Sequence, residues 1–343
     1  MEYGAIDLHT RRSQIRIVRE DGTVVLDRRI DTTRPAFDEL FGGRGAMQIL
    51  LESSTESEWV AAQLETGGHE VVVADPNYAA MYGSRSRKVK TDKRDVAALA
   101  EANRTGVFRR AHRASAGARA LRQTLRVRQH LVQMRGRSIS LLRALLRRDG
   151  LRLASGSAEG LLTRLDRLTI PAPLMTVIAP VRELLTALNA LLAARDAEVE
   201  TRAADPTTQR LMTAPGVGPV VALTFQAVMD DPARFGGQAA RASAFLGLVP
   251  SEDSSAERHR KGHITKTGPN DLRALLVQAS WTIWRGRSAA GADLRAWAHA
   301  LAARRGRRIA VVALARRVSR ILYAMWRDHT DFEVRPRRSA AAA

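Results

Sequence analysis

The amino-acid sequence predicts an α/β domain at the N-terminus, then a helical coiled-coil hairpin, and finally a mostly helical C-terminal domain. Three observations support this fold class. Short apolar runs bounded by turn residues fill the first 75 residues, leucines recur at helical spacing from residue 121 to residue 200, and apolar helical patterns continue to residue 328. At 343 residues and 45% hydrophobic content, the chain can bury a core in each of two or three domains.

The predicted elements of the N-terminal domain follow the order βββαβαβ, and a further helix comes after them. The first three strands form a meander, because Asp21 and Gly22 supply a hairpin turn. A capping box of Thr55 and Glu58 opens the second helix. The predicted strands cover 3–9, 14–20, 23–30, 47–52 and 69–75, and the predicted helices cover 35–43, a segment from Thr55, and 92–103.

This order is that of the ribonuclease H-like fold, in which the first strand is central and the fourth pairs parallel beside it. Asp7 lies in the first predicted strand and Glu52 ends the fourth, so the two carboxylates are expected to be neighbours. An aspartate inside a strand is costly unless it is paired. The alternatives are an ion pair of Asp7 with Arg11 or Arg12, and simple solvent exposure of Glu52.

The net charge indicates a polyanionic partner. The chain has 55 Lys and Arg against 35 Asp and Glu, a formal charge of +20 and a pI near 11.4, which favours nucleic acid. A membrane is not expected, because no apolar run reaches the roughly 18 to 20 residues of a spanning helix and no signal peptide opens the chain. The absence of cysteine excludes disulfides and thiolate zinc sites, which leaves carboxylates and hard cations as the plausible metal chemistry.

Two further aspartates, Asp92 and Asp95, lie in the strongly basic segment "RSRKVKTDKRDVAALAE". Their spacing puts both on one face of a helix, where they either pair with neighbouring cations or act together with Asp7 and Glu52. The neighbouring cations are Lys88, Lys90, Lys93 and Arg94.

Three motifs, "GAIDLH", "LLESS" and "KTDKRDVAALA", resemble those of the DEDD transposases of the IS110 insertion-sequence family, which are Piv-like and have a RuvC-like N-terminal domain. The resemblance implies that Asp7, Glu52, Asp92 and Asp95 are catalytic. Four carboxylates at one place repel one another unless a cation such as Mg²⁺ compensates them. Two ions about 3.5 to 4 Å apart can activate an attacking oxygen and stabilise a leaving one. The basic neighbours would then guide a phosphate backbone to the site.

Residues 245–279 are similar to the C-terminal transposase domain of the same family, whose serine attacks DNA and becomes covalently linked to it. The pattern falls on Ser255, with Ser254 beside it. Without the resemblance, both serines are typical polar loop residues. Ala256 replaces the glycine that usually follows the serine, and Pro269 interrupts the usual Gly-Asn pair at the start of a helix. Nearby cations suited to stabilising a serine alkoxide are Arg258, Arg260, Lys261 and Lys266.

Between these two blocks, residues 104–152 hold fourteen arginines and a single acid, Asp149. The apolar stripe is expected to pack within the hairpin or across a dimer, and the arginine face is expected to contact phosphate because no acidic helix is apparent nearby. Gly216 and Gly218 are typical either of a helix-hairpin-helix turn that approaches a phosphate or of a tight interhelical turn. The tryptophans expected mainly in the core are Trp281, Trp284, Trp297 and Trp326.

The sequence therefore predicts a DNA transposase or site-specific recombinase that uses Mg²⁺ and a serine nucleophile on donor and target DNA. The resemblance also implies a bridge RNA as guide, and we expect a homo-oligomer, a dimer or tetramer, in the bacterial cytoplasm near the nucleoid. The expected domains are 1–108, 109–205 and 206–330, with a disordered tail at 331–343. Two alternatives stay open: a metal-dependent Holliday-junction resolvase in which water attacks, and a non-enzymatic RNA-binding protein.

Overall fold

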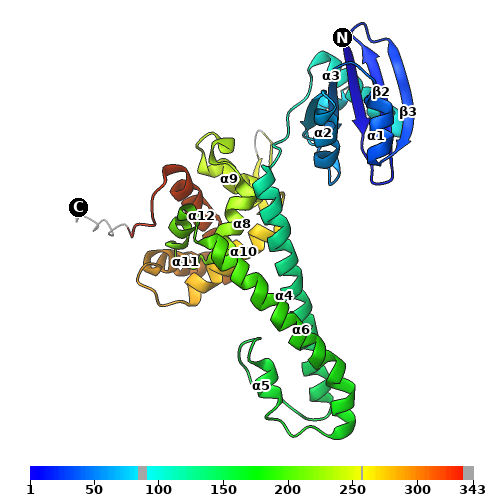
Figure 1. Cartoon of the computed structure of the whole chain (residues 1–343). Coiled ribbons are helices and arrows are strands. Elements are labelled where there is room, and N and C mark those ends of the chain that lie inside the picture. The colour runs from blue at the N-terminus through cyan, green and yellow to red at the C-terminus, as the bar shows by residue number, and fades with distance from the viewer. Residues whose placement is uncertain (84–90, 256–257, 335–343) are drawn as a thin grey trace, which may run out of the picture. The chain divides into compact units, whose positions relative to one another are not determined.

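The computed structural model describes residues 1–83, 91–255 and 258–334, with the backbone alone for 253–255 and 258–260 (Figure 1). Contacts between residues divide the chain into two compact units, Met1–Arg113 and Ala114–Ala343. The predicted limits at residues 108, 205 and 330 stay predictions. Most of the tail expected to be disordered lies outside the described residues.

The first unit contains a five-stranded mixed sheet in the order β3-β2-β1-β4-β5. Strand β1 is central, pairing antiparallel with β2 and parallel with β4, while β3 and β5 form the two edges. The prediction of a central first strand beside a parallel fourth strand is confirmed. The strands are β1 (Glu2–Asp7), β2 (Arg12–Arg19), β3 (Val24–Asp31), β4 (Gln48–Glu52) and β5 (Glu70–Ala74).

Helices cover both faces of this sheet, because alternate residues of each strand are apolar on opposite faces. Ile6 packs with Phe37 of α1 (Arg34–Phe41) and Val60 of α2 (Ser57–Thr66). Ala5 packs on the other face with Leu99 of α3 (Asp92–Thr105) and with Met81 of the short 3₁₀ helix η1 (Ala79–Tyr82). The predicted order of elements is confirmed, and it is the order of an RNase H-like domain.

The prediction that Thr55 and Glu58 open α2 as a capping box is wrong. Helix α2 is capped at Glu56, whose side chain makes no cap hydrogen bond and instead accepts one from the indole N–H of Trp59 at 2.5 Å. The preceding turn is closed by Ser57, whose hydroxyl donates to the carbonyl oxygen of Ser54 at 2.9 Å. This local hydrogen bond satisfies the turn without Thr55.

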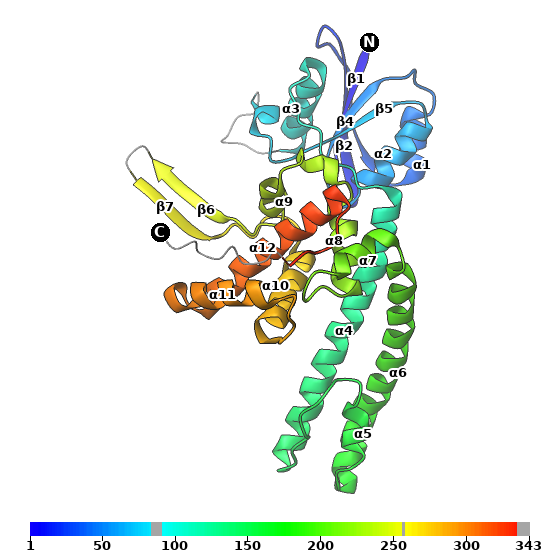
Figure 2. The ribbon, with the colours of Figure 1, turned by 90° about the vertical axis from the view of Figure 1, so that its left-hand side faces the viewer.

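The second unit is almost entirely helical, as predicted (Figure 2). It begins with two long helices, α4 (Ala116–Arg148) and α6 (Ala172–Ala203), joined by a connection that contains α5 (Leu161–Leu165). A compact C-terminal cluster follows, around a core that includes Phe225, Leu276 and Tyr323. Its elements are α7 (Pro206–Met212), α8 (Pro219–Met229), η2 (Pro232–Phe235), α9 (Ala239–Phe245), β6 (Pro250–Ser255), β7 (Arg258–Ile264), α10 (Asn270–Arg285), α11 (Ala292–Arg305) and α12 (Arg307–Asp328).

Several arginines of α4 have partners inside the unit, which corrects the expectation of an unneutralised arginine face. Arg128 pairs with Asp196 of α6 at 2.6 Å, and Arg135 pairs with Glu159 of the connection at 2.9 Å. Arg122 donates to the carbonyl oxygens of Ala227 and Val228 at the end of α8. Acidic partners were not apparent from the sequence because they lie more than twenty residues from these arginines along the chain.

Helix α6 is long and apolar enough to cross a membrane, judged by length and composition alone, with 22% of its most apolar 18-residue window buried. The expectation that no segment reaches this length is therefore wrong. The cause is a helix with two apolar stripes. One stripe is buried and includes Ile178, Leu185 and Leu192, and the other is exposed and includes Leu184 and Leu191.

Candidate metal and nucleic-acid site

The pairing of β1 with β4 brings two predicted carboxylates together where these two strands end. The parallel register places Ile6 beside Leu51, so the next residues, Asp7 and Glu52, end their strands at the same edge. Asp7 shares the face that α3 covers, because side chains alternate along a strand and Ala5 packs on that face. Its side chain is only 13% exposed.

Helix α3 supplies the other two carboxylates from its first turn. The hydroxyl of Thr91 caps the helix by accepting a hydrogen bond from the backbone N–H of Arg94. Helix formation therefore begins at Asp92, and Asp92 and Asp95 lie three residues apart on the same face. Asp95 is buried, and Asp92 is half-buried.

Asn103 fixes the other end of α3 against the sheet. This buried side chain donates hydrogen bonds to the carbonyl oxygens of Gly4 in β1, at 2.8 Å, and Gln48 in β4, at 2.9 Å. One amide thus bridges the two strands that carry Asp7 and Glu52. The position of α3 along the sheet is consequently fixed near the C-terminal end of the helix.

The four carboxylates act on one another electrostatically. Burial raises the pKa of Asp7, His9 lowers it, and the negative charges of Glu52, Asp92 and Asp95 each raise it further. Repulsion among close carboxylates disfavours their ionised forms unless a cation compensates it. A divalent cation with oxygen ligands, such as Mg²⁺, fits this donor set.

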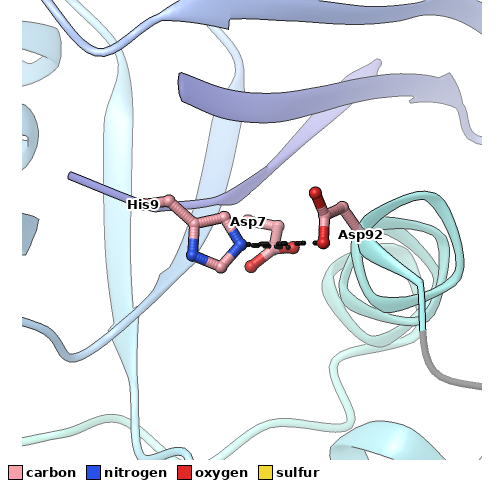
Figure 3. Close-up of side chains that lie close together, drawn as sticks. All are labelled: Asp7, His9 and Asp92. Carbon is pink, nitrogen blue, oxygen red and sulfur yellow. Dashed lines mark ion pairs between the residues drawn. The ribbon is translucent and has the colours of Figure 1, made fainter. Parts of the chain in front are cut away.

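His9 joins this group, and sequence reasoning missed it (Figure 3). Its Nε2 lies 3.4 Å from Asp7 Oδ2 and 3.9 Å from Asp92 Oδ1, and each of the three residues can place one ligand atom within 4.8 Å of the others. The available signal was the Asp-x-His spacing at the end of a strand, where alternate residues share a face. The alternative pairing of Asp7 with Arg12 is not observed, because Arg12 pairs with Asp31 at 3.1 Å.

Tyr82 is a second residue that sequence reasoning missed. It ends η1, the short helix that follows β5, and its hydroxyl donates a hydrogen bond to Glu52 Oε1. The neighbouring Met81 is 1% exposed and anchors the turn in the core. A donor held in this way orients the Glu52 carboxylate.

A row of side chains across three strands extends the site toward the β3 edge. In the register of the sheet Asp7 lies opposite Gln14, and Gln14 lies opposite Arg29. Gln14 is 4% exposed and donates to Asp27 Oδ1 at 2.5 Å, while Arg29 Nη2 lies 3.6 Å from Asp92 Oδ2. A cavity of about 660 Å³ opens beside this row and is lined by Gln14, Asp27, Arg28, Arg29, Thr91, Asp92 and Lys93.

This cavity is suited to a phosphate backbone, because three of its lining residues are cations beside a carboxylate cluster. Lys93, predicted to bind nucleic acid, is one of them, whereas Arg28 and Arg29 were missed because their placement depends on the strand register. Arg94 is exposed in the same turn of α3. The predicted residues Lys88 and Lys90 lie outside the described part of the chain.

Ser255 ends β6 in the other unit. The two-stranded hairpin pairs Ser255 with Arg258 and Ser254 with His259. Side chains are described for two of the four cations predicted to lie near the serine. These two, Lys261 and Lys266, are exposed. The backbone thus places Arg258 directly across from Ser255, and Arg260 two residues further along β7.

The base of this hairpin is held by Arg273, a buried residue of α10. Its guanidinium donates to the carbonyl oxygens of Leu246 and Thr267, at 3.1 and 2.9 Å, on the segments that enter and leave the hairpin. Gly268 has φ +73°, and a Cβ there would lie 2.0 Å from the carbonyl oxygen of Phe245. Glycine is therefore required where the two segments meet.

Gly216 has a packing role that is independent of nucleic acid. It has φ +73°, and a Cβ would lie 2.6 Å from the carbonyl oxygen of Ala279 in α10. Gly218 is the N-cap of α8, with open space around it. A phosphate contact at either glycine stays a prediction.

Two family models match the chain. A model of the DEDD transposase domain of IS110 elements matches residues 5–148, and a model of the IS116/IS110/IS902 transposase family matches residues 208–294. The chain belongs to the IS110/IS116/IS902 family of transposases. It is thus an enzyme of DNA transesterification that binds DNA, and its DEDD domain implies catalysis that depends on a divalent metal. Family membership decides against the non-enzymatic alternative.

Bacterial relatives match over much of their length. A probable family 20 transposase of Pseudomonas aeruginosa is 28% identical over 83% of this chain and 85% of its own. The transposase for insertion sequence element IS1111A of Coxiella burnetii is 30% identical over 69% of this chain and 66% of its own. The transposase for insertion sequence element IS1328 of Yersinia enterocolitica is 23% identical over 83% of this chain and 85% of its own.

Asp7→Asn should weaken the binding of divalent metal to this IS110-family transposase, and with it the stabilisation that the metal provides. For the native protein, Mg²⁺ at about 100 times its dissociation constant should raise the free energy of unfolding by about 2.7 kcal/mol. The variant should lose most of this gain, yet be at least as stable as the native protein in chelator, because one repelling charge is gone. Denaturant unfolding with and without Mg²⁺ measures both effects. Asp21→Asn, in an exposed turn, is the control, and equal stabilisation of Asp7→Asn and native protein would contradict the assignment.

Tyr82→Phe should weaken metal-dependent activity without unfolding the protein. Removing the hydroxyl leaves Glu52 without its donor, and loss of such a supporting hydrogen bond typically costs about 10- to 100-fold in metal affinity or activity. Metal titrations of DNA cleavage should show a higher half-saturating Mg²⁺ concentration. Tyr78→Phe, four residues earlier, is the matched control, and identical titrations for the two variants would exclude a role for Tyr82.

Proposed function

We propose that this transposase cuts and rejoins DNA with Ser255 as nucleophile and with Mg²⁺ held by Asp7, Glu52, Asp92 and Asp95. The observation that carries the metal half of this proposal is the convergence of three other carboxylates on Asp7, where β1 and β4 end side by side. When bound, the metal supplies charge stabilisation for phosphoryl transfer. Lys93, Arg28 and Arg29 bind the neighbouring backbone phosphates, and Tyr82 keeps Glu52 oriented.

The serine half of the proposal concerns one phosphoryl transfer. The Ser255 oxygen forms a bond to phosphorus, the bond from phosphorus to the leaving strand breaks, and the serine proton passes to solvent while the leaving oxygen takes up a proton. The resulting phosphoserine keeps the bond energy for rejoining. Support comes from the family match over residues 208–294, which includes Ser255, and from the backbone register, which pairs Ser255 with Arg258. A cationic residue type suits a developing negative charge.

Ser255→Ala should abolish a covalent protein–DNA adduct that the native protein forms. Purified protein is incubated with co-purified RNA, Mg²⁺ and end-labelled junction DNA, then denatured, and labelled protein is quantified on a gel. Ser254→Ala is the matched control and should retain the adduct. Cut DNA without any adduct in the native protein would instead support attack by water, as in a Holliday-junction resolvase, and an adduct in Ser255→Ala would move the nucleophile elsewhere.

We also propose that a guide RNA binds the helical hairpin formed by α4 and α6. Arg137, Arg147 and Arg148 of α4 are exposed on it, and exposed cations of this kind bind phosphates. RNA should co-purify with the native protein at low salt and dissociate as salt rises. Replacing these three arginines by glutamine should reduce the recovered RNA, and unchanged recovery would contradict the proposal.

We propose further that copies of this chain associate through the exposed apolar face of the helical hairpin formed by α4 and α6. Residues spaced by seven form an outward stripe on each helix, which is the pattern of a further helix–helix contact. The stripes are Val127, Met134 and Leu141 on α4, and Val177, Leu184 and Leu191 on α6. A second copy of the hairpin that packs along either stripe would bury apolar side chains that the single chain leaves at its surface.

Leu191→Glu should therefore dissociate the oligomer. Leu191 is 52% exposed in the single chain, and burying an unpaired carboxylate costs more than the roughly 1.4 kcal/mol that corresponds to tenfold weaker association. Light scattering across a concentration series measures the mass. Ala190→Glu, on an adjacent exposed residue, should leave the mass unchanged, and an unchanged mass for Leu191→Glu would remove this face from the interface.

A further inference from the structure

Three tryptophans expected in the core lie at the surface of the C-terminal cluster. Trp326 is 9% exposed and packs edge-on against Phe225 as predicted, but Trp297 is 37% exposed and Trp281 and Trp284 are half-buried. Trp284 packs partly against the core, whereas Trp281 lines a surface cavity of about 530 Å³ together with Gln278, Thr282, Arg285 and Gly286.

Gln278, Trp281, Thr282 and Arg285 form one ridge of α10, which we call the Trp281 ridge. Their spacing of three, four and seven residues places all four on the same side of the helix. Helices α11 and α12 pack beside α10. The packing of α10 against these two helices holds the ridge in a fixed position.

Aromatic rings continue outward from this ridge. Trp281 and Trp284 meet edge to face with ring centroids 6.2 Å apart, and Trp284 stacks on the exposed His299 of α11 at 4.0 Å and 10°. Trp284 covers one face of the His299 ring, and His299 is exposed. Flat rings presented in this way are the surfaces on which unpaired bases stack.

Arginines flank the rings. The guanidinium carbon of Arg285 lies 5.1 Å from the centre of the Trp281 ring, and that of Arg307, at the start of α12, lies 5.7 Å from it. Residues 270–328, which span α10 to α12, contain twelve arginines and three acids, Asp271, Asp293 and Asp328. This imbalance makes the surface complementary to a phosphate backbone.

We propose that the Trp281 ridge binds a single-stranded segment of nucleic acid, with an unpaired base against the Trp281–Arg285 surface and its phosphates against Arg307. Stacking and positive charge at one place are the combination typical of single-strand binding. A duplex hides the base faces, so the ridge distinguishes unpaired strands from duplex DNA. The proposal rests on neither Ser255 nor the metal site.

The test compares strands that differ only in their bases. The full chain is titrated in chelator against a labelled oligothymidylate of about 12 nucleotides and against an abasic strand of the same length and charge. Anisotropy should show the base-bearing strand binding about tenfold more tightly, which is within the range of base–aromatic stacking. Equal affinity of the native protein for the two strands would overturn the proposal without any variant being made.

Variants then locate the site. Trp281→Leu should lose the preference for the base-bearing strand, and Trp281→Phe should keep most of it. Arg307→Gln should weaken the binding of both strands equally and lower the salt dependence of the affinity. Oligouridylate and its abasic form, measured in parallel, tell whether the natural strand is RNA or DNA. A native-like base preference in Trp281→Leu would place the stacking elsewhere and contradict the proposal.

Discussion

The parallel pairing of β1 with β4 is the constraint on which the site depends. It forces Asp7 and Glu52 to end their strands at one edge, and Asn103 bridges the same two strands to hold α3 above them. Because Asn103 holds α3 against the sheet, Asp92 in the first turn of the helix lies close to Asp7. The fold therefore keeps a concentration of negative charge that a divalent cation would stabilise. Burial, and after it the charges of the other three carboxylates, raise the pKa of Asp7.

The sequence was sufficient for the strand order and for the neighbouring positions of Asp7 and Glu52, because both depend on local patterns such as alternation along strands and an Asp-Gly turn. The metal-binding role of the four carboxylates stays a prediction. The residues that sequence reasoning missed depend on register or on an irregular turn. Arg29 reaches Asp92 only because β2 and β3 align Gln14 between Arg29 and Asp7. Tyr82 reaches Glu52 through a 3₁₀ turn some thirty residues later in the chain, which no periodicity indicates.

The second unit shows where helical periodicity is ambiguous. It correctly predicts α4 and α6, but it does not say which of several stripes is buried. On α6 one stripe packs against α4 and a second, one residue earlier in each heptad, stays exposed, so the helix is apolar enough to pass for a membrane span. Likewise, tryptophans at apolar spacing on α10 and α11 were expected in the core, yet neighbouring arginines make a polar surface around Trp281 stable.

The two proposed surfaces would recognise different features of nucleic acid. Cations beside the carboxylates, such as Arg29 and Lys93, would contact phosphates that every strand carries, and would position DNA without choosing among its forms. An aromatic ridge such as that of Trp281 interacts with base faces, which are accessible only when a strand is unpaired. Phosphate contacts weaken as salt rises, whereas stacking depends little on salt. A transposase with both can hold duplex DNA loosely and retain single strands, such as an unpaired RNA loop or an opened DNA junction, for which phosphate contacts alone give no preference.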